Sequence, residues 1–179
     1  MKRNVKRHAV VQPQDQSIKL IPLTQGQVTV VDAIEYESLS LWAWFAWRNN
    51  ANSCYYAVHD AWDPETKRNV RIYMARHIMN APPDLQVDHI NRNTLDNRRA
   101  NLRLATQSQN QHNRPKWKKR VDGFKGVYQN ADTKMWYACI WVNNKSVYLG
   151  QFADEISAAI AYNEAAVVLH GEFACLNQI

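Results

Sequence analysis

The chain has 179 residues, a net charge of +6 and 46% hydrophobic residues, a composition typical of one large globular domain or two small ones. No apolar run approaches the roughly 20 residues that a membrane span needs, and the basic N-terminus precedes no apolar signal core. The 3 cysteines form no CxxC pair, which favours neither a disulfide framework nor a cysteine zinc site. We therefore expect a cytoplasmic protein with no membrane partner.

The first half of the chain predicts short strands and short helices. Apolar residues alternate with polar ones on both sides of Gly26, and Pro82 would end the helix before it. The predicted elements are a basic flexible tail at 1–16, strands within 18–31, a helix at 33–41 capped by Asp32, strands at 53–59 and 69–74, and a helix at 76–80.

Residues 114–122 are basic and contain a proline, which predicts a linker, and a different pattern begins at Gly123. Three β-rich runs follow at 125–130, 135–142 and 146–152, and then a helix from Asp154 to Gly171. In the second run, Ala138, Ile140 and Val142 alternate with Tyr137, Cys139 and Trp141, which predicts one face under the helix and one outward face. We expect the helix to pack on that sheet with one stripe of apolar residues, Ile156, Ala159, Ile160 and Val167.

Positive charge is concentrated in part of the chain. Residues 92–125 contain ten Lys and Arg against two Asp, whereas residues 126–179 contain two basic and five acidic side chains. A basic band on an acidic background is typical of a protein that binds a polyanion, nucleic acid above all. A solvated basic surface without a partner is the alternative interpretation.

The segment 87–113 carries the residues that best suggest chemistry. Asp88 and His89 end an apolar run, and carboxamides follow at Asn101 and Asn110. If a β-hairpin packs on a helix, Asp88 and Asn110 meet, and their oxygens suit Mg²⁺. His89 could then deprotonate a water for attack on a phosphodiester.

This segment resembles the HNH endonuclease motif of the ββα-metal type, common in phage and intron-encoded homing endonucleases. The family pattern VDHINxNxLDNRxxNLRxxTxxxNxxN is matched at every fixed position. The resemblance implies that Asp88 and Asn110 bind Mg²⁺ (or Mn²⁺), that His89 is the general base and that Asn101 holds the loop between the strands. Asn113 is a weaker ligand candidate.

The run just before the motif departs from this family at one position. Relatives usually have His-Arg where this chain has Ala75-Arg76, so an imidazole near the phosphates is missing. Three explanations remain open: natural drift, replacement by a neighbour such as His77, and a deliberate substitution that weakens a toxic nuclease. We favour the third, in which Ala75 is an altered site.

Residues 123–177 resemble an AP2 DNA-binding domain. The matching segments include Tyr148-Leu-Gly-Gln-Phe and Ala161-Tyr-Asn-Glu-Ala-Ala. In that family the sheet enters the major groove and the helix packs behind it, which implies DNA contacts from this sheet. Tyr128, Cys139, Trp141 and Ser146 replace charged family residues, which lowers the expectation of tight base readout. The expected contacts here are Lys125, Tyr128, Asn130, Trp141 and Tyr148.

Together these observations predict an α+β protein: an N-terminal β-rich extension and ββα-metal nuclease domain at 17–113, a basic linker at 114–122, and an AP2-like domain of three antiparallel strands and one helix at 123–179. The predicted function is site-specific cleavage of double-stranded DNA by a monomer or homodimer. The alternative is a catalytically weak or inactive DNA-binding regulator. Further DNA contacts are expected from Arg92, Arg98, Arg99, Arg103, Lys116, Lys118, Lys119 and Arg120.

Overall fold

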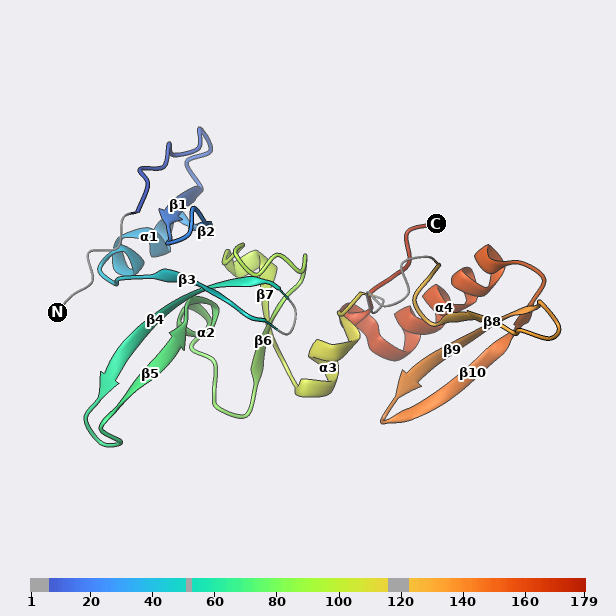
Figure 1. Ribbon diagram of the computed structural model, residues 1–179. Helices are drawn as coiled ribbons and strands as arrows, with labels where there is room; N and C mark the ends of the chain where they lie inside the picture. Colours follow the sequence, from blue (N-terminus) through green and yellow to red (C-terminus); the bar gives the residue numbers. More distant parts are fainter. Residues whose placement is uncertain (1–6, 51–52, 116–122) are drawn as a thin grey trace. The chain divides into compact units, whose positions relative to one another are not determined.

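The computed structural model describes residues 7–50, 53–115 and 123–179, which form a mixed α/β protein (Figure 1). The chain divides into two compact units, Met1–Thr106 and Gln107–Ile179. Residues 107–113, which were predicted to belong to the nuclease domain, therefore fall in the second unit. Residues 1–6 of the predicted tail and 116–122 of the predicted linker lie outside the described residues.

The N-terminal unit is built from three antiparallel sheets, ordered β1-β2, β3-β4-β5 and β6-β7. Strand β3 was not predicted, because it continues an aromatic run from Trp42 and turn residues, Asn49 and Asn50, mark only its end. The elements are β1 (Ile18–Pro22), β2 (Val28–Asp32), α1 (Ala33–Ser40), β3 (Phe45–Arg48), β4 (Tyr55–Asp63), β5 (Arg68–Tyr73), α2 (Met74–Met79), β6 (Gln86–His89), a 3-10 helix (Arg99–Asn101) and β7 (Leu102–Ala105).

The β1–β2 hairpin is joined to the loop between β6 and β7. Val30 donates its backbone N–H to Leu95 and accepts from that of Asn97, forming a short parallel bridge. The Asp32 carboxylate accepts from the backbone N–H of Arg99 and does not cap α1. The N-terminal hairpin therefore supports the loop that follows β6.

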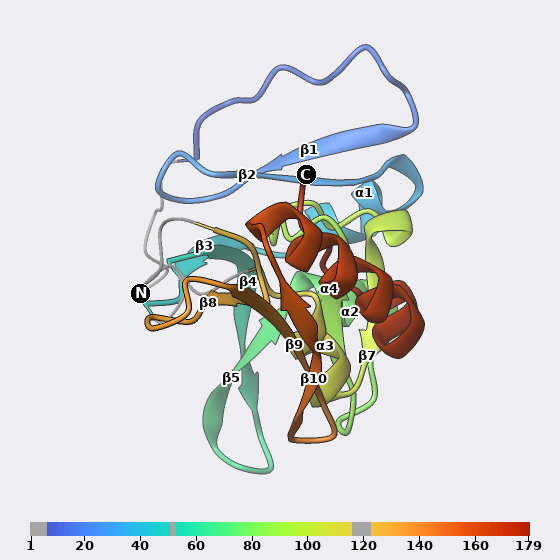
Figure 2. The same ribbon diagram turned by 90° about the vertical axis from the view of Figure 1, so that its right-hand side faces the viewer.

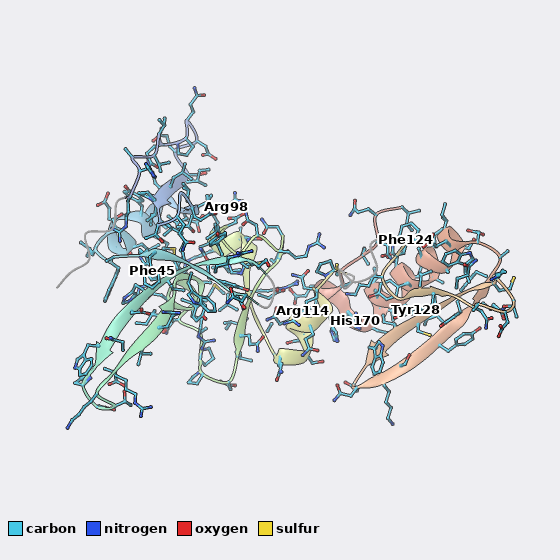
Figure 3. All side chains as sticks on the ribbon, in the orientation of Figure 1. Phe45, Arg98, Arg114, Phe124, Tyr128 and His170 are labelled. Carbon is cyan, nitrogen blue, oxygen red and sulfur yellow. The ribbon has the colours of Figure 1, made fainter. Side chains whose placement is uncertain are left out.

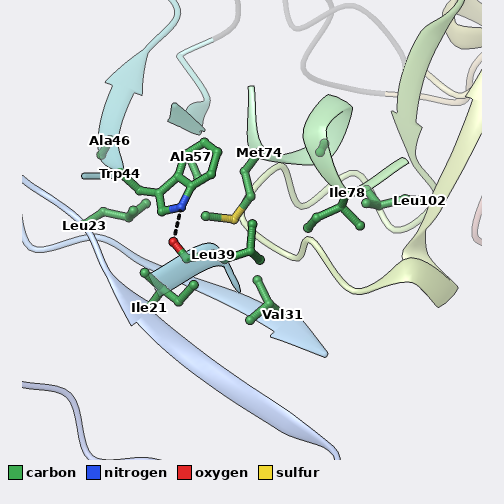
Figure 4. Close-up of a cluster of buried hydrophobic side chains, with 11 residues drawn as sticks. Ile21, Leu23, Val31, Leu39, Trp44, Ala46, Ala57, Met74, Ile78 and Leu102 are labelled. Carbon is green, nitrogen blue, oxygen red and sulfur yellow. Dashed lines mark hydrogen bonds between the residues drawn. The ribbon is translucent and has the colours of Figure 1, made fainter. Parts of the chain in front are cut away.

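The core of this unit lies between the hairpin, α1, α2 and the strands (Figure 4). Trp44 is fully buried at its centre and donates from Nε1 to the carbonyl of Leu39 at 2.8 Å. Met74 packs in the same cluster, and Ile78 extends it from α2 towards Leu102 on β7. Because α2 and the β6–β7 hairpin share this core, the position of the hairpin depends on how well the core is packed.

Buried His59 on β4 lies between two tryptophans. Its ring centroid is 4.7 Å from that of Trp42 and 5.0 Å from that of Trp44. Its Nε2 has no hydrogen-bond partner among the described residues, and burial lowers its pKa. The folded unit therefore favours neutral His59.

We expect acid to destabilise this unit through His59. As the pH falls below about 6.5, the unfolded chain takes up a proton that folded His59 resists, so stability decreases. The melting temperature should fall between pH 7.5 and pH 5.5, and His59→Phe should make that fall smaller. Thermal unfolding of both proteins at the two pH values checks this, and equal falls would exclude His59 as the cause.

The C-terminal unit consists of a three-stranded antiparallel sheet, ordered β10-β9-β8, with helix α4 along one face (Figure 2). All three predicted strands and the long helix are confirmed. The elements are α3 (Gln107–His112), β8 (Val127–Gln129), β9 (Trp136–Val142), β10 (Lys145–Phe152), α4 (Glu155–His170) and a 3-10 helix (Gly171–Phe173). No helix in the described part of the chain has the length and apolarity needed to cross a bilayer.

The predicted faces of β9 are confirmed, but only Ala159 of the predicted stripe of α4 is buried. Ala138 and Ile140 are buried under the helix, and Trp141 is exposed. The helix buries three alanines and two rings, Ala158, Ala159, Ala166, Tyr162 and His170, while Ile156, Ile160 and Val167 are exposed. Alanines let the helix approach the sheet closely, which the bulkier stripe would prevent.

Candidate active site

Strand β6 carries Asp88 and His89 into the interior of the N-terminal unit. In the β6–β7 ladder Asp88 is opposite Arg103, and His89 is opposite Leu102. Both side chains are buried, with 5% and 7% of their surface exposed. Because successive strand residues point to opposite faces, the Asp88 carboxylate and the His89 imidazole lie on opposite sides of the strand.

Asp88 forms an ion pair with the residue opposite it. Arg103 donates to Oδ2 of Asp88 from Nε at 2.8 Å and from Nη2 at 2.6 Å. The Arg103 side chain is only 10% exposed, so this predicted DNA contact is turned towards the site. The two hydrogen bonds and the opposite charge of Arg103 offset part of the cost of burying the Asp88 carboxylate.

His89 is held by a residue of the loop. Its Nε2 lies 3.2 Å from Oδ1 of Asn97, a buried side chain that was not among the predicted site residues. Burial lowers the pKa of His89, an effect opposed by the Asn97 hydrogen bond and the nearby Asp88 and Asp96 charges. The neutral imidazole that a general base requires is thus favoured near pH 7.

Asn101 links the two ends of the loop between β6 and β7. Its Oδ1 accepts from the backbone N–H of Asn91 at 2.9 Å, and its Nδ2 donates to the carbonyl of Asp96 at 2.8 Å. The Asp96 carboxylate accepts from Asn91 and Arg98, and hydrogen bonds from Arg98 lower its pKa. These contacts fix the backbone directly after His89.

Two of the predicted DNA-binding arginines of this loop, Arg98 and Arg99, are held in ion pairs. Arg98 binds Asp96 and remains 40% exposed, whereas Arg99 binds Glu35 of α1 and remains 54% exposed. Arg92 has a positive φ of 64° and is exposed. These three side chains are accessible to a phosphate, in contrast to Arg103.

Asn110, the second predicted metal ligand, lies on α3 in the C-terminal unit. The His112 ring at the end of this helix stacks on His170 at 3.7 Å. Lys125 donates from Nζ to the carbonyls of His112 and Arg114 at 2.7 Å each. The C-terminal unit therefore holds α3, and the pairing of Asn110 with Asp88 stays a prediction, as does the role of Asn113.

The outward face of the C-terminal sheet carries predicted DNA contacts. Tyr148 and Trp141 are each 60% exposed, and Tyr128 stacks on Tyr137 with ring centroids 5.4 Å apart. Asn130 instead accepts backbone hydrogen bonds within its own turn. Figure 3 shows Tyr128 and His170 on this unit. Lys116, Lys118, Lys119 and Arg120 lie outside the described residues.

Ala75 lies in the buried core on α2. Its neighbour Arg76 donates to the carbonyls of Leu85, Ala81 and Pro82, which shapes the segment leading into β6. His77, the suggested replacement for the missing imidazole, packs against Trp42 and Trp44.

The donor set suits a hard divalent cation at Asp88. Within the described ranges, no three His, Cys, Asp or Glu side chains gather as a metal site. A cation at Asp88 would therefore depend on carboxylate, carboxamide and phosphate oxygens, the ligands that Mg²⁺ prefers. It would share the carboxylate with Arg103, which holds Oδ2.

Comparison with known proteins agrees with the chemistry of this segment. Residues 80–112 match the family model for HNH endonucleases. An uncharacterised HNH endonuclease of Acanthamoeba polyphaga mimivirus is 38% identical over 98 residues, which cover 55% of this chain and 50% of the relative. Residues 80–112 are thus similar to HNH endonucleases, and the chain spans about half the length of the curated relative it matches.

Proposed function

We propose that this chain is a site-specific endonuclease of the homing type, which hydrolyses phosphodiester bonds of double-stranded DNA. The observation that carries the proposal is the match of residues 80–112 to HNH endonucleases, in a segment where strand β6 ends on Asp88 and His89. The polar loop around Asn101 supports it, because a general base needs a fixed backbone.

His89 takes a proton from water as the water oxygen attacks phosphorus and the bond to the leaving oxygen breaks. Asp88 and Asn110 would hold Mg²⁺ or Mn²⁺, which supplies stabilisation of charge on the phosphate and the leaving oxygen. Arg103 balances the Asp88 carboxylate from the opposite strand. Asn101 keeps the following loop in place and does not contact the reacting atoms.

The C-terminal unit would place the nuclease on its target as an AP2-like DNA-binding domain. Its three-stranded sheet backed by one helix, with Trp141 and Tyr148 on the outward face, supports this assignment. Residues 126–179 carry few positive charges, so aromatic and polar contacts would dominate there. The basic residues of 92–125 other than Arg103 would follow the phosphate backbone and make affinity strongly salt-dependent.

The proposal is tested by incubating the full chain with supercoiled plasmid and Mg²⁺. We expect nicked circles from a monomer with one active centre, or linear DNA if a homodimer cuts both strands, and EDTA should abolish either product. Binding without any nicking at high protein concentration would favour the alternative, a non-catalytic DNA-binding regulator.

We further propose that Ala75 attenuates the nuclease. Ala75→His should raise the nicking rate, on the order of 10-fold, by returning an imidazole to the region of the phosphates. Because Ala75 is buried, Ala75→Leu is the matched control, adding similar volume without a polar ring. Plasmid nicking by all three proteins checks this, and unchanged cleavage by a folded Ala75→His protein would contradict it.

A further inference from the structure

A continuous chain of buried hydrogen bonds joins the N-terminal hairpin to His89. Thr29 of β2 donates from Oγ1 to the carbonyl of Leu95 at 2.8 Å. Asn97 donates from Nδ2 to Oγ1 of Thr29 at 2.8 Å. The other end of the Asn97 carboxamide, Oδ1, lies 3.2 Å from Nε2 of His89.

The donor and the acceptor of each hydrogen bond in this series follow from the bond that the Thr29 hydroxyl donates. The Thr29 hydroxyl has two acceptors within reach, the Leu95 carbonyl oxygen at 2.8 Å and the weaker Sδ of Met74 at 3.9 Å, so its hydrogen points to Leu95 and away from Asn97. The Thr29 oxygen is then an acceptor, which draws the NH₂ group of Asn97. The carboxamide oxygen is left facing the imidazole, so Nε2 must be the donor.

We propose that Thr29 and Asn97 are positioning residues that keep a hydrogen on Nε2 of His89 and thereby make Nδ1 the basic nitrogen. This rests on the proposed function, in which His89 accepts a proton from the attacking water. Nε2 keeps its hydrogen in both protonation states, so the proton gained and lost in the reaction is the one on Nδ1. The N-terminal extension is then part of the catalytic apparatus, although it lies outside residues 80–112.

Burial makes this arrangement sensitive to a single hydroxyl. Thr29 is fully buried and Asn97 is 2% exposed, so water cannot readily replace a lost partner. Without the hydroxyl, the NH₂ group of Asn97 loses its acceptor, and turning the carboxamide over becomes favourable. Its NH₂ group would then face Nε2 and favour the opposite tautomer.

The tautomer is measured directly by ¹⁵N NMR of the imidazole rings in the full chain, without DNA or metal. The signals of His89, one of 6 histidines, are identified by their loss in His89→Ala. We expect the Nε2–H tautomer in the wild type and in Thr29→Ser, and a shift towards Nδ1–H in Thr29→Val. An Nδ1–H tautomer in the wild type would overturn the inference, whether or not the protein cuts DNA.

Nicking kinetics provide the second readout. Thr29→Val should lower kcat roughly 10-fold and Asn97→Leu on the order of 100-fold, with KM unchanged, because the base is misoriented while DNA binding is intact. Thr29→Ser should restore most of the rate. Thr24→Val is the matched control: it removes a hydroxyl that bonds Ala46 and not Asn97, so it should alter neither tautomer nor kcat. Equal rates for Thr29→Val and Thr24→Val would contradict the inference.

Discussion

Replacing His89 with alanine should lower the rate of DNA cleavage by about 10²- to 10⁴-fold, the range that a general base contributes. The imidazole lies at the end of β6 beside Asp88, its Nε2 is held by Asn97, and burial lowers its pKa, so it is neutral when it meets water. Initial rates of plasmid nicking with Mg²⁺ measure the effect. The affinity for the same DNA in a gel-shift assay should change little, because binding depends on other residues.

His8→Ala is the control for this variant. His8 lies in the N-terminal segment, is exposed and belongs to no helix or strand, so its loss should leave the nicking rate unchanged. If His89→Ala cuts as fast as His8→Ala, His89 is not the general base.

Gly126→Ala should destabilise the C-terminal unit by on the order of 3 kcal/mol or more. Gly126 has a φ of +73°, and an added Cβ would meet the ring of buried Tyr162 and lie 2.6 Å from the carbonyl of Cys139. The backbone cannot easily retreat, because the Gly126 carbonyl accepts from the N–H of Cys139 at 2.8 Å. Chemical denaturation of the full chain should show a C-terminal transition at lower denaturant, and DNA affinity should fall with it.

Gly26→Ala separates backbone strain from this clash. Gly26 has a similar φ of +68°, but an added Cβ there has no atom within 4 Å among its described neighbours. Its cost should be limited to the left-handed backbone, about 1 kcal/mol. If both variants lose the same free energy of unfolding, the contact between Gly126 and Tyr162 does not constrain the fold.

Strand alternation predicted the C-terminal sheet well, because each strand has one buried face. On β9, Ala138 and Ile140 point to the helix and Trp141 points away. The turn at Asn143 and Asn144 follows an equally local rule, because asparagine tolerates the positive φ that both residues have. Local rules were sufficient where the structure depends on near neighbours.

The face of α4 could not be predicted in this way. A helical pattern favours the larger apolar residues for the buried stripe, and Ile156 and Ile160 fit that rule. The buried residues of α4 are mostly alanines, because close approach of helix and sheet leaves little space for larger side chains; Tyr162 and His170 are the two rings among them. This depends on the distance between two elements, which no single segment encodes.

The motif showed which residues of the candidate site carry the chemistry, but not which residues hold them in place. Asp88 and His89 are neighbours in a recognisable pattern, whereas Thr29 is 68 residues from Asn97. The only sequence signal was a polar residue within an otherwise apolar strand. Likewise, counting basic residues suggested Arg103 as a DNA contact, and only the strand pairing brings it to Asp88.

We propose above all that residues 80–112 hold a centre that cuts DNA at defined sequences, with His89 as the general base. The most direct measurement is cleavage mapping on a plasmid library with Mg²⁺, using the wild type and His89→Ala in parallel. We predict breaks at a defined set of sequences with the wild type and none above background with the variant. The same breaks with both proteins, or no breaks with the wild type while it binds the DNA, would contradict the account.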